Sequence, residues 1–246
     1  MKRYLKDEIG DTAAYMKISI VIPALNEEKR IGRLVETLWT LESGDGNLCE
    51  IIVADGGSSD ATRSEAEGAG AVVITCSRKG RAVQMNEGAE SASGDILYFL
   101  HADTTPPQQF DMEIIRAVSK GAGAGCFQLR FSMDHPVLRF YGWCTRFKTT
   151  LVRFGDQSLF VTSANFQKIR GFDEELVVME DQKIVGNLKA LTSFALLDEA
   201  VETSARKYEK NGVVRLQFIF VMIVMLYYLG AKQDTLIHLY TSLIKL

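Results

Sequence analysis

Four short polar segments carry the side chains that are best suited to bind a ligand. Each follows an apolar run, and they cover residues 23–27, 55–59, 77–81 and 101–104. Carboxylates such as those of Glu27 and Asp55 accept hydrogen bonds strongly, and guanidinium groups such as that of Arg81 bind phosphate oxygens. A fifth segment, 179–182, holds two adjacent acids that could act on a proton, a task worth roughly 10²–10⁴ in rate.

The elements between these segments predict how they meet. Apolar runs predict strands at 18–22, 51–54, 72–75 and 96–100, and amphipathic stretches predict helices at about 27–41, after residue 60 and near 81–91. This alternation predicts an α/β fold, a doubly wound and mostly parallel sheet with helices on both faces. Ligands of such sheets bind outside the carboxyl ends of the strands, so we expect one polar, partly acidic crevice.

The pattern changes after residue 105. We predict a strand at 124–131 that could run antiparallel, a helix at about 137–151 and a strand at 156–161. A helix opens at 179–182, and a last strand covers 194–197. The sequence contains no repeat and no low-complexity linker, so one domain with an elaborated second half is the simplest interpretation.

The composition is that of a globular protein. The 246 residues are 47% hydrophobic and 24% charged, with a formal net charge of −3, which excludes long disorder, collagen and coiled coil as the main structure. Four widely spaced Cys and three His give no zinc-ligand or disulfide pattern and favour a reducing compartment. Residues 1–16 are polar, predict an arm or a loose helix, and lack the apolar core of a signal peptide, so we expect a cytoplasmic protein.

The C-terminal residues differ from the rest. Residues 205–246 carry six Lys or Arg and two Asp or Glu, a net charge of +4, whereas the remainder carries −7. The same tail contains the apolar run 218–231. This run is short for a membrane span, which needs about 20 residues. It predicts a buried helix, a homodimer interface through 213–231, or a helix on the inner face of the cell membrane, helped by Arg206, Lys207, Lys210 and Arg215.

Taken together, the motifs resemble family 2 glycosyltransferases of the GT-A fold. The resemblance rests on ISIVIPALNEE at 18–28, EIIVADGGSSDAT at 50–62, FLHADT at 99–104 and MED at 179–181. The sequences KGRAVQMN at 79–86, LHADT at 100–104 and GDQ at 155–157 are similar to a bacterial subgroup of small, nonprocessive members. The resemblance covers residues 17–206, which predicts a GT-A domain there and a helical tail at 207–246.

The resemblance implies transfer of a sugar from a UDP- or GDP-linked donor to an acceptor, with inversion and one sugar per turnover. Asp181 would be the catalytic base and Glu180 the alternate. Mg²⁺ or Mn²⁺ would be held by Asp103 and by His101, which replaces the first Asp of the family's usual Asp-x-Asp. Asp156 and Gln157 would line the acceptor or sugar pocket. The implied donor-binding residues are Pro23, Ala24, Asn26, Glu27, Asp55, Gly57, Arg81, Asn86, Ala102 and Arg206.

Several alternatives stay open. Each of these acids could instead cap a helix or shape a loop, and the loop at 78–81 could simply be solvated. A catalytically silent GT-A-like binding protein and a sugar-1-phosphate nucleotidyltransferase are the competing functions, although the loop at 23–28 lacks the glycines that the latter needs. No G-x-G-x-x-G follows a strand, and no basic aromatic surface pattern predicts nucleic-acid binding. The acceptor stays open, and the basic apolar tail raises a lipid-linked one as an alternative.

Overall fold

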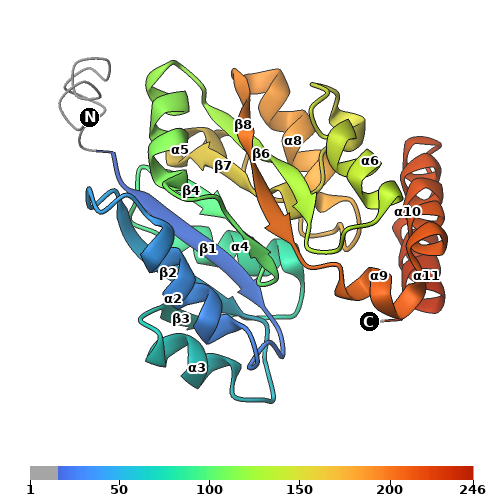
Figure 1. Cartoon of the computed structure of the whole chain (residues 1–246), viewed down its shortest axis with the longest axis horizontal. Coiled ribbons are helices and arrows are strands. Elements are labelled where there is room, and N and C mark those ends of the chain that lie inside the picture. Colours follow the sequence, from blue (N-terminus) through green and yellow to red (C-terminus); the bar gives the residue numbers. More distant parts are fainter. Residues whose placement is uncertain (1–15, 246) are drawn as a thin grey trace.

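A computed structural model of the chain describes residues 16–245. The arm predicted at 1–16 therefore lies almost wholly outside the described residues. One eight-stranded sheet forms the centre, in the order β3-β2-β1-β4-β7-β6-β8-β5 (Figure 1). The strands are β1 (Ile18–Ala24), β2 (Leu48–Asp55), β3 (Val72–Thr75), β4 (Ile96–Phe99), β5 (Thr104–Thr105), β6 (Ala124–Phe131), β7 (Leu159–Thr162) and β8 (Phe194–Thr203).

The first half of the chain builds the parallel part of this sheet. β1 pairs in parallel with β2 and β4, and β2 pairs in parallel with β3. Continuous apolar sequences suit β1 and β4 because both of their faces are buried, whereas β3 at the edge is partly exposed. Ile18, Ile20 and Ile22 point into one core and Val21 into the other, and all four are fully buried.

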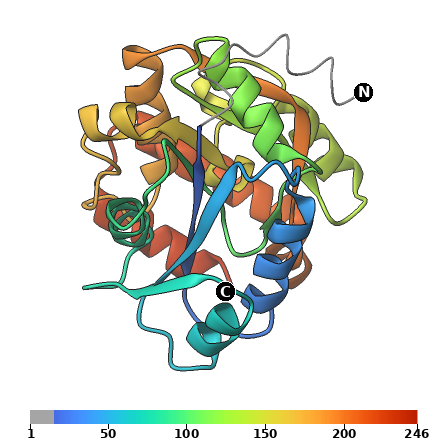
Figure 2. The same cartoon turned by 90° about the vertical axis from the view of Figure 1, so that its left-hand side faces the viewer.

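Helices cover both faces, as predicted (Figure 2). On one side α2 (Ile31–Leu41), α3 (Thr62–Gly68) and α5 (Phe110–Ser119) pack into the core that holds Ile20. On the other side α4 (Arg81–Glu90), α7 (Ser163–Lys168) and α8 (Glu180–Leu191) pack into the core that holds Val21. The predicted doubly wound α/β fold class is therefore confirmed.

The second half departs from the predicted boundaries. β7 pairs antiparallel with both β4 and β6, whereas β6 pairs in parallel with β8. β7 starts at Leu159, not at 156, because residues 155–157 form a 3₁₀ turn. The helix expected at 137–151 is α6 (Pro136–Cys144), followed by a 3₁₀ turn at 150–152. The helix expected from residue 27 begins at Ile31, and β8 continues to Thr203.

The C-terminal residues form the predicted helical tail. It consists of α9 (Arg206–Asn211), α10 (Val213–Tyr228) and α11 (Gln233–Leu243), and the last two lie side by side. Leu216, Ile219 and Ile223 of α10 are buried in a third core, which also contains Leu138 of α6 and Tyr208 of α9.

The opposite face of α10 is exposed. The exposed apolar residues recur at helical spacing and form one stripe, made of Val214, Phe218, Val221, Met225 and Tyr228. Only one face of the helix formed by the apolar run is therefore buried in the core. Within residues 16–245, no helix is both long and apolar enough to cross a membrane.

Candidate functional site

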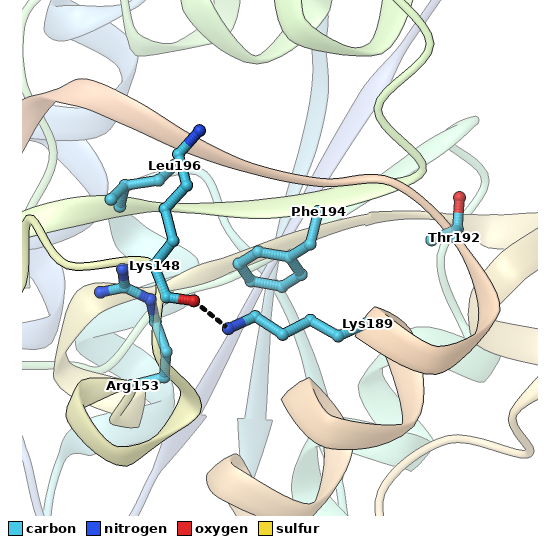
Figure 3. Close-up of a pocket in the computed structure, with 6 residues that line it drawn as sticks. All are labelled: Lys148, Arg153, Lys189, Thr192, Phe194 and Leu196. Carbon is cyan, nitrogen blue, oxygen red and sulfur yellow. Dashed lines mark hydrogen bonds between the residues drawn. The ribbon is translucent and has the colours of Figure 1, made fainter.

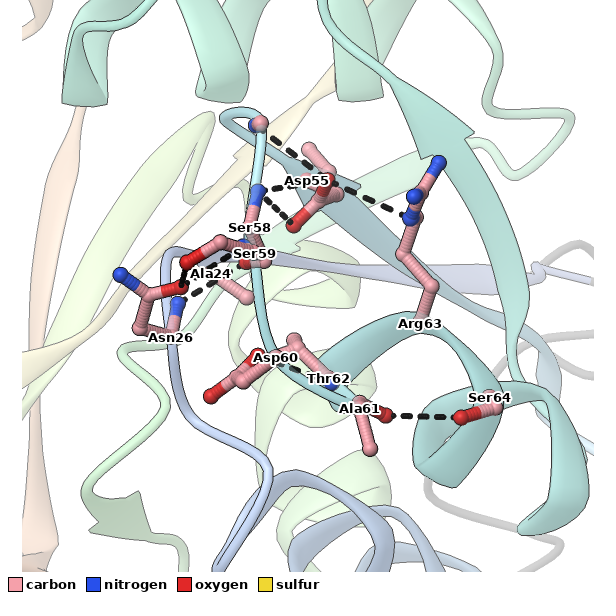
Figure 4. A network of polar contacts seen from close by, with 12 residues as sticks. Ala24, Asn26, Asp55, Ser58, Ser59, Asp60, Ala61, Thr62, Arg63 and Ser64 are labelled. Atoms are coloured by element: carbon pink, nitrogen blue, oxygen red, sulfur yellow. Dashed lines mark hydrogen bonds and ion pairs between the residues drawn. The ribbon is translucent and has the colours of Figure 1, made fainter.

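Two strand-end loops are tied together by polar contacts. The Asn26 side-chain oxygen accepts a hydrogen bond from the Ser59 N–H at 2.9 Å, and the Asn26 N–H donates to the Ser58 hydroxyl at the same distance (Figure 4). Asn26 has a φ of 54° and Gly57 a φ of 89°, which is the left-handed region where Asn and Gly are tolerated best. Asn26 thus fixes the loop, and the side chain predicted to contact the donor is engaged by protein.

Asp55 closes the loop that follows β2. Its side chain is fully buried, and it accepts hydrogen bonds from the N–H groups of Gly57 and Ser58 at 3.1–3.2 Å. Arg63 lies 3.9 Å from the same carboxylate. In this structure Asp55 therefore shapes the loop, which was the alternative to ligand binding. Its contact with a ribose stays a prediction.

Glu27 and Arg206 meet although 179 residues separate them. Arg206 Nη2 lies 3.5 Å from a Glu27 carboxylate oxygen, and Arg30 binds the other oxygen at 3.0 Å. Both side chains are about one-third exposed or less, so they remain partly accessible. Pro23 and Ala24 end the neighbouring strand β1. The structure therefore brings Arg206, one of the implied donor-binding residues, to the first strand-end loop.

Gln84, which is not among the predicted site residues, anchors the two central strands. Its buried amide nitrogen donates to the carbonyls of Ala24 and Ala54, at 2.7 and 2.8 Å. These are the last or next-to-last residues of β1 and β2. A polar side chain at an otherwise buried position of α4, among Ala82, Val83 and Met85, is the sequence signal for this role.

Asn86, one of the implied donor-binding residues, is held by protein groups. Its amide oxygen accepts from the Phe172 N–H, and its nitrogen donates to the Phe172 carbonyl and to Glu174. Both ends of the side chain thus hold the loop at 172–174. The structure gives Asn86 a loop-anchoring role, and its predicted contact with the donor has no support in these hydrogen bonds.

The two acids predicted as the catalytic base and its alternate, Asp181 and Glu180, both face Arg81. Arg81 Nη1 lies 3.1 Å from a Glu180 oxygen and 3.9 Å from Asp181 Oδ2. Glu180 is buried, whereas the Asp181 side chain is 19% exposed and so remains reachable by a ligand. Burial and then the neighbouring Asp181 charge raise the pKa of Glu180 to about 7, against the opposing effect of Arg81. The two adjacent acids therefore have different environments, which suits different roles.

Gly155 joins the predicted base to the predicted metal ligand. Its N–H donates to Asp181 Oδ2 at 3.1 Å. A Cβ at this position would lie 2.3 Å from Asp181 Oδ2 and 2.6 Å from the His101 ring, so any larger residue would displace these two side chains. The sequence predicts a motif at 155–157, but it does not predict the role of Gly155, which depends on residues far away in the chain.

His101 and Asp156 form a polar pair. His101 Nδ1 and Asp156 Oδ1 are 3.2 Å apart, and the imidazole is 13% exposed. Partial burial opposes ionisation of Asp156, whose side chain is 44% exposed, but the hydrogen bond with His101 and the charges of Lys207 and Arg81 hold its pKa below the ordinary range. If Nδ1 carries the proton toward Asp156, Nε2 keeps its lone pair for a ligand.

The remaining predicted residues are placed as follows. Ala102 is buried and Asp103 half-buried in the turn between β4 and β5, and the Asp103 backbone carbonyl accepts from Ser204. Gln157 is fully buried and donates to the Phe127 carbonyl at 3.1 Å, which is a structural contact. Within residues 16–245, no three His, Cys, Asp or Glu side chains cluster as a metal site.

The raised pKa of Glu180 predicts how stability depends on pH. The folded state holds this proton up to about pH 7, whereas an unfolded Glu loses it near 4.5, so its contribution to stability is complete below 4.5 and is lost as the pH rises to 7. The free energy of unfolding of Glu180→Gln, relative to that of the wild type, should therefore increase by roughly 1–3 kcal/mol as the pH rises from 4.5 to 7.5. Urea unfolding at several pH values measures this, with exposed Glu199→Gln as the control. A constant difference across the range would contradict the shift.

Comparison with known proteins agrees with this architecture. The model of the glycosyl transferase family 2 matches residues 19–175. A glucosyl-3-phosphoglycerate synthase of Mycolicibacterium smegmatis is 35% identical over 98 residues, which are 37% of this chain and 32% of that protein. The chain therefore aligns with about a third of the length of the curated relatives it matches first.

Solved structures extend the similarity to the whole fold. The crystal structure of S. aureus TarS 1–349 has a TM-score of 0.65 at 17% identity and covers 91% of this chain and 69% of that one. Glucosyl-3-phosphoglycerate synthase from Mycobacterium tuberculosis, in complex with Mn²⁺, UDP and glucosyl-3-phosphoglycerate, has a TM-score of 0.62 at 20% identity and covers 92% and 84%. The sheet and its helices match the GT-A fold, and the chain belongs to the glycosyl transferase family 2.

Proposed function

We propose that the protein transfers one sugar per turnover from a nucleotide diphosphate sugar to an acceptor, with inversion. The observation that carries this proposal is the convergence of Arg81, Gly155 and His101 on Asp181 at the carboxyl edge of the parallel strands. Family membership and the fold support the reaction class. The likeness to the nonprocessive subgroup rests on the motifs at 79–86, 100–104 and 155–157.

Asp181 is the proposed base for the acceptor hydroxyl. The Gly155 N–H and Arg81 both face Oδ2, so we infer that Oδ1 accepts the proton. The acceptor oxygen then attacks the anomeric carbon from the side opposite the leaving diphosphate, which gives inversion by analogy with inverting hydrolysis. The diphosphate is a good leaving group, so no protein acid is required.

The donor is proposed to lie along the loops at 23–27 and 55–59. The Glu27 carboxylate suits ribose hydroxyls, and Arg206 beside it suits the diphosphate. The neighbours in complex with UDP favour a UDP-linked donor over a GDP-linked one.

The donor chemistry of Asp103 and His101 would suit a divalent cation whose other ligands are diphosphate oxygens and water, although no three possible protein ligands cluster among residues 16–245. Asp103 would supply a carboxylate and His101 a ring nitrogen, with Asp156 orienting the imidazole. A bound Mg²⁺ or Mn²⁺ would neutralise charge on the leaving diphosphate. M. tuberculosis glucosyl-3-phosphoglycerate synthase has been crystallised in one complex with Mn²⁺ and in another with Mg²⁺.

The tail is proposed to act as a separate unit, with residues 17–206 as the catalytic domain and 207–246 as the contact with the inner face of the cell membrane. In the sequence, the exposed stripe of α10 comes shortly after Lys207 and Lys210 of α9 and includes the neighbours of the exposed Arg215. Apolar side chains flanked by cations suit an anionic lipid surface. This arrangement would bring a lipid-linked acceptor to the cytoplasmic enzyme.

Asp181→Asn should bind donor as the wild type does but reduce transfer at least a hundredfold, because the hydroxyl proton has no acceptor. The measurement combines calorimetric binding and turnover over a panel of UDP- and GDP-sugars with Mn²⁺, with exposed Asp198→Asn as the control. Full activity of Asp181→Asn would refute the base. Binding without turnover by the wild type, over a broad acceptor panel, would favour a silent binding protein.

Asp103→Ala should weaken binding of UDP in the presence of Mn²⁺ by at least tenfold, since one protein ligand is removed. The paramagnetic resonance signal of free Mn²⁺ reports the metal itself, independently of turnover. Asp45→Ala, in an exposed loop, is the matched control. If chelation by EDTA leaves UDP binding unchanged in the wild type, the metal assignment fails.

Phe218→Ser should lower binding to vesicles that contain anionic lipid by several-fold, because Phe218 is 70% exposed within the stripe. Cosedimentation measures this, with exposed Val72→Ser on β3 as the control. If the wild type does not bind vesicles and instead forms a dimer that Phe218→Ser dissociates, the stripe is a subunit interface and the membrane proposal is wrong.

A further inference from the structure

A second group of cations lies away from the strand-end loops. A cavity of about 170 Å³ is lined by Lys148 and Arg153 from the segment after α6, by Lys189 and Thr192 at the end of α8, and by Phe194 and Leu196 of β8 (Figure 3). Three of these six side chains are cationic and none is acidic. Such a composition favours a negatively charged ligand.

Arg153 is the buried element of this cavity. It is 1% exposed, and its terminal nitrogens donate to the backbone carbonyls of Thr145, at 2.6 Å, and Phe147. Its Nε has no hydrogen-bond partner among the described residues. Neutral carbonyls satisfy donors but leave the charge uncompensated, and a buried charge without a counter-ion is costly.

Lys189 adds a second charge that is held in place. Its ammonium donates to the Lys148 carbonyl at 3.2 Å and to the Thr150 hydroxyl at 3.3 Å, and it lies 5.4 Å from the centre of the Phe194 ring. Among residues 16–245, neither Lys189 nor Arg153 forms an ion pair within 4.0 Å.

The two cations disfavour each other. Burial lowers the pKa of Lys189, and the Arg153 charge lowers it further. Burial also lowers the pKa of Arg153. An anion between them would reverse both effects, since an opposite charge stabilises the ionised form.

We propose that this cavity is a binding site for a small oxyanion, a phosphate or carboxylate group, held by Arg153 and Lys189, with the exposed Lys148 at its rim. The volume is well below the roughly 300–1,000 Å³ of pockets for drug-sized ligands, so the occupant is small. Phe194 and Leu196 provide an apolar wall, which suits an anion on a short carbon chain.

This site is separate from the proposed donor and acceptor sites. Lys189 follows Asp181 by eight residues on the same helix, which places their backbones about 12 Å apart. None of the six lining residues belongs to the predicted donor, metal, catalytic or acceptor set. Binding here is therefore independent of whether the glycosyl-transfer proposal is correct.

Calorimetric titration of the full chain with inorganic phosphate, and separately with malonate, tests the site and distinguishes the two anion classes. We expect saturable binding of at least one anion. Lys189→Gln should weaken it at least tenfold, because a charge-assisted hydrogen bond is lost. Lys183→Gln removes the same charge from an exposed position of the same helix and should leave the affinity unchanged.

Two further variants keep the test decisive. Lys148→Gln changes an exposed side chain and provides a second weakening variant if Lys189→Gln lowers the melting temperature. Arg206→Gln reports on phosphate binding at the strand-end loops. The proposal is overturned if neither anion binds saturably, if Lys183→Gln weakens binding as much as Lys189→Gln, or if Arg206→Gln abolishes binding that both cavity variants retain.

Discussion

Parallel pairing of β1 with β2 and β4 is the constraint on which the candidate site depends. The register aligns Ala24 with Asp55 and Val21 with Phe99, so the loops that follow these strands start at one edge of the sheet. Gln84 reinforces this edge by binding the carbonyls of both Ala24 and Ala54. Because Gln84 lies one turn after Arg81 on α4, the same anchor fixes the helix start that carries the guanidinium.

Once the edge is fixed, the distribution of charge in the site follows. Glu180 is deeply buried, so its ionisation is costly, and Arg81 at 3.1 Å offsets that cost only in part. The position of both acids in the first turn of α8 is favourable because the helix dipole is positive there. Asp181 is more exposed and is oriented by the Gly155 N–H, so an acid that is accessible to substrate stands beside one that is not.

The sequence predicted what depends on local pattern. Apolar runs predicted the four strands β1 to β4, and amphipathic stretches predicted α2, α3 and α4. What it could not predict depends on distant partners. Asn86 follows Gln84 by two residues and looks equivalent to it, yet one anchors the strand ends and the other the loop at 172–174. Likewise, the burial of Asp55 and the contact between Gly155 and Asp181 arise only when separate segments are packed together.

The segment 145–157 shows why the boundary of the site is hard to draw from motifs. Arg153 binds the carbonyls of Thr145 and Phe147, and only two residues later Gly155 holds Asp181. The oxyanion cavity and the candidate site thus share one short piece of backbone. Shared backbone alone does not couple two sites, because a ligand shifts an equilibrium only by its difference in affinity for two conformations. An anion in the cavity would therefore change sugar transfer only if residues 153–157 have a second arrangement in which Arg153 no longer faces it.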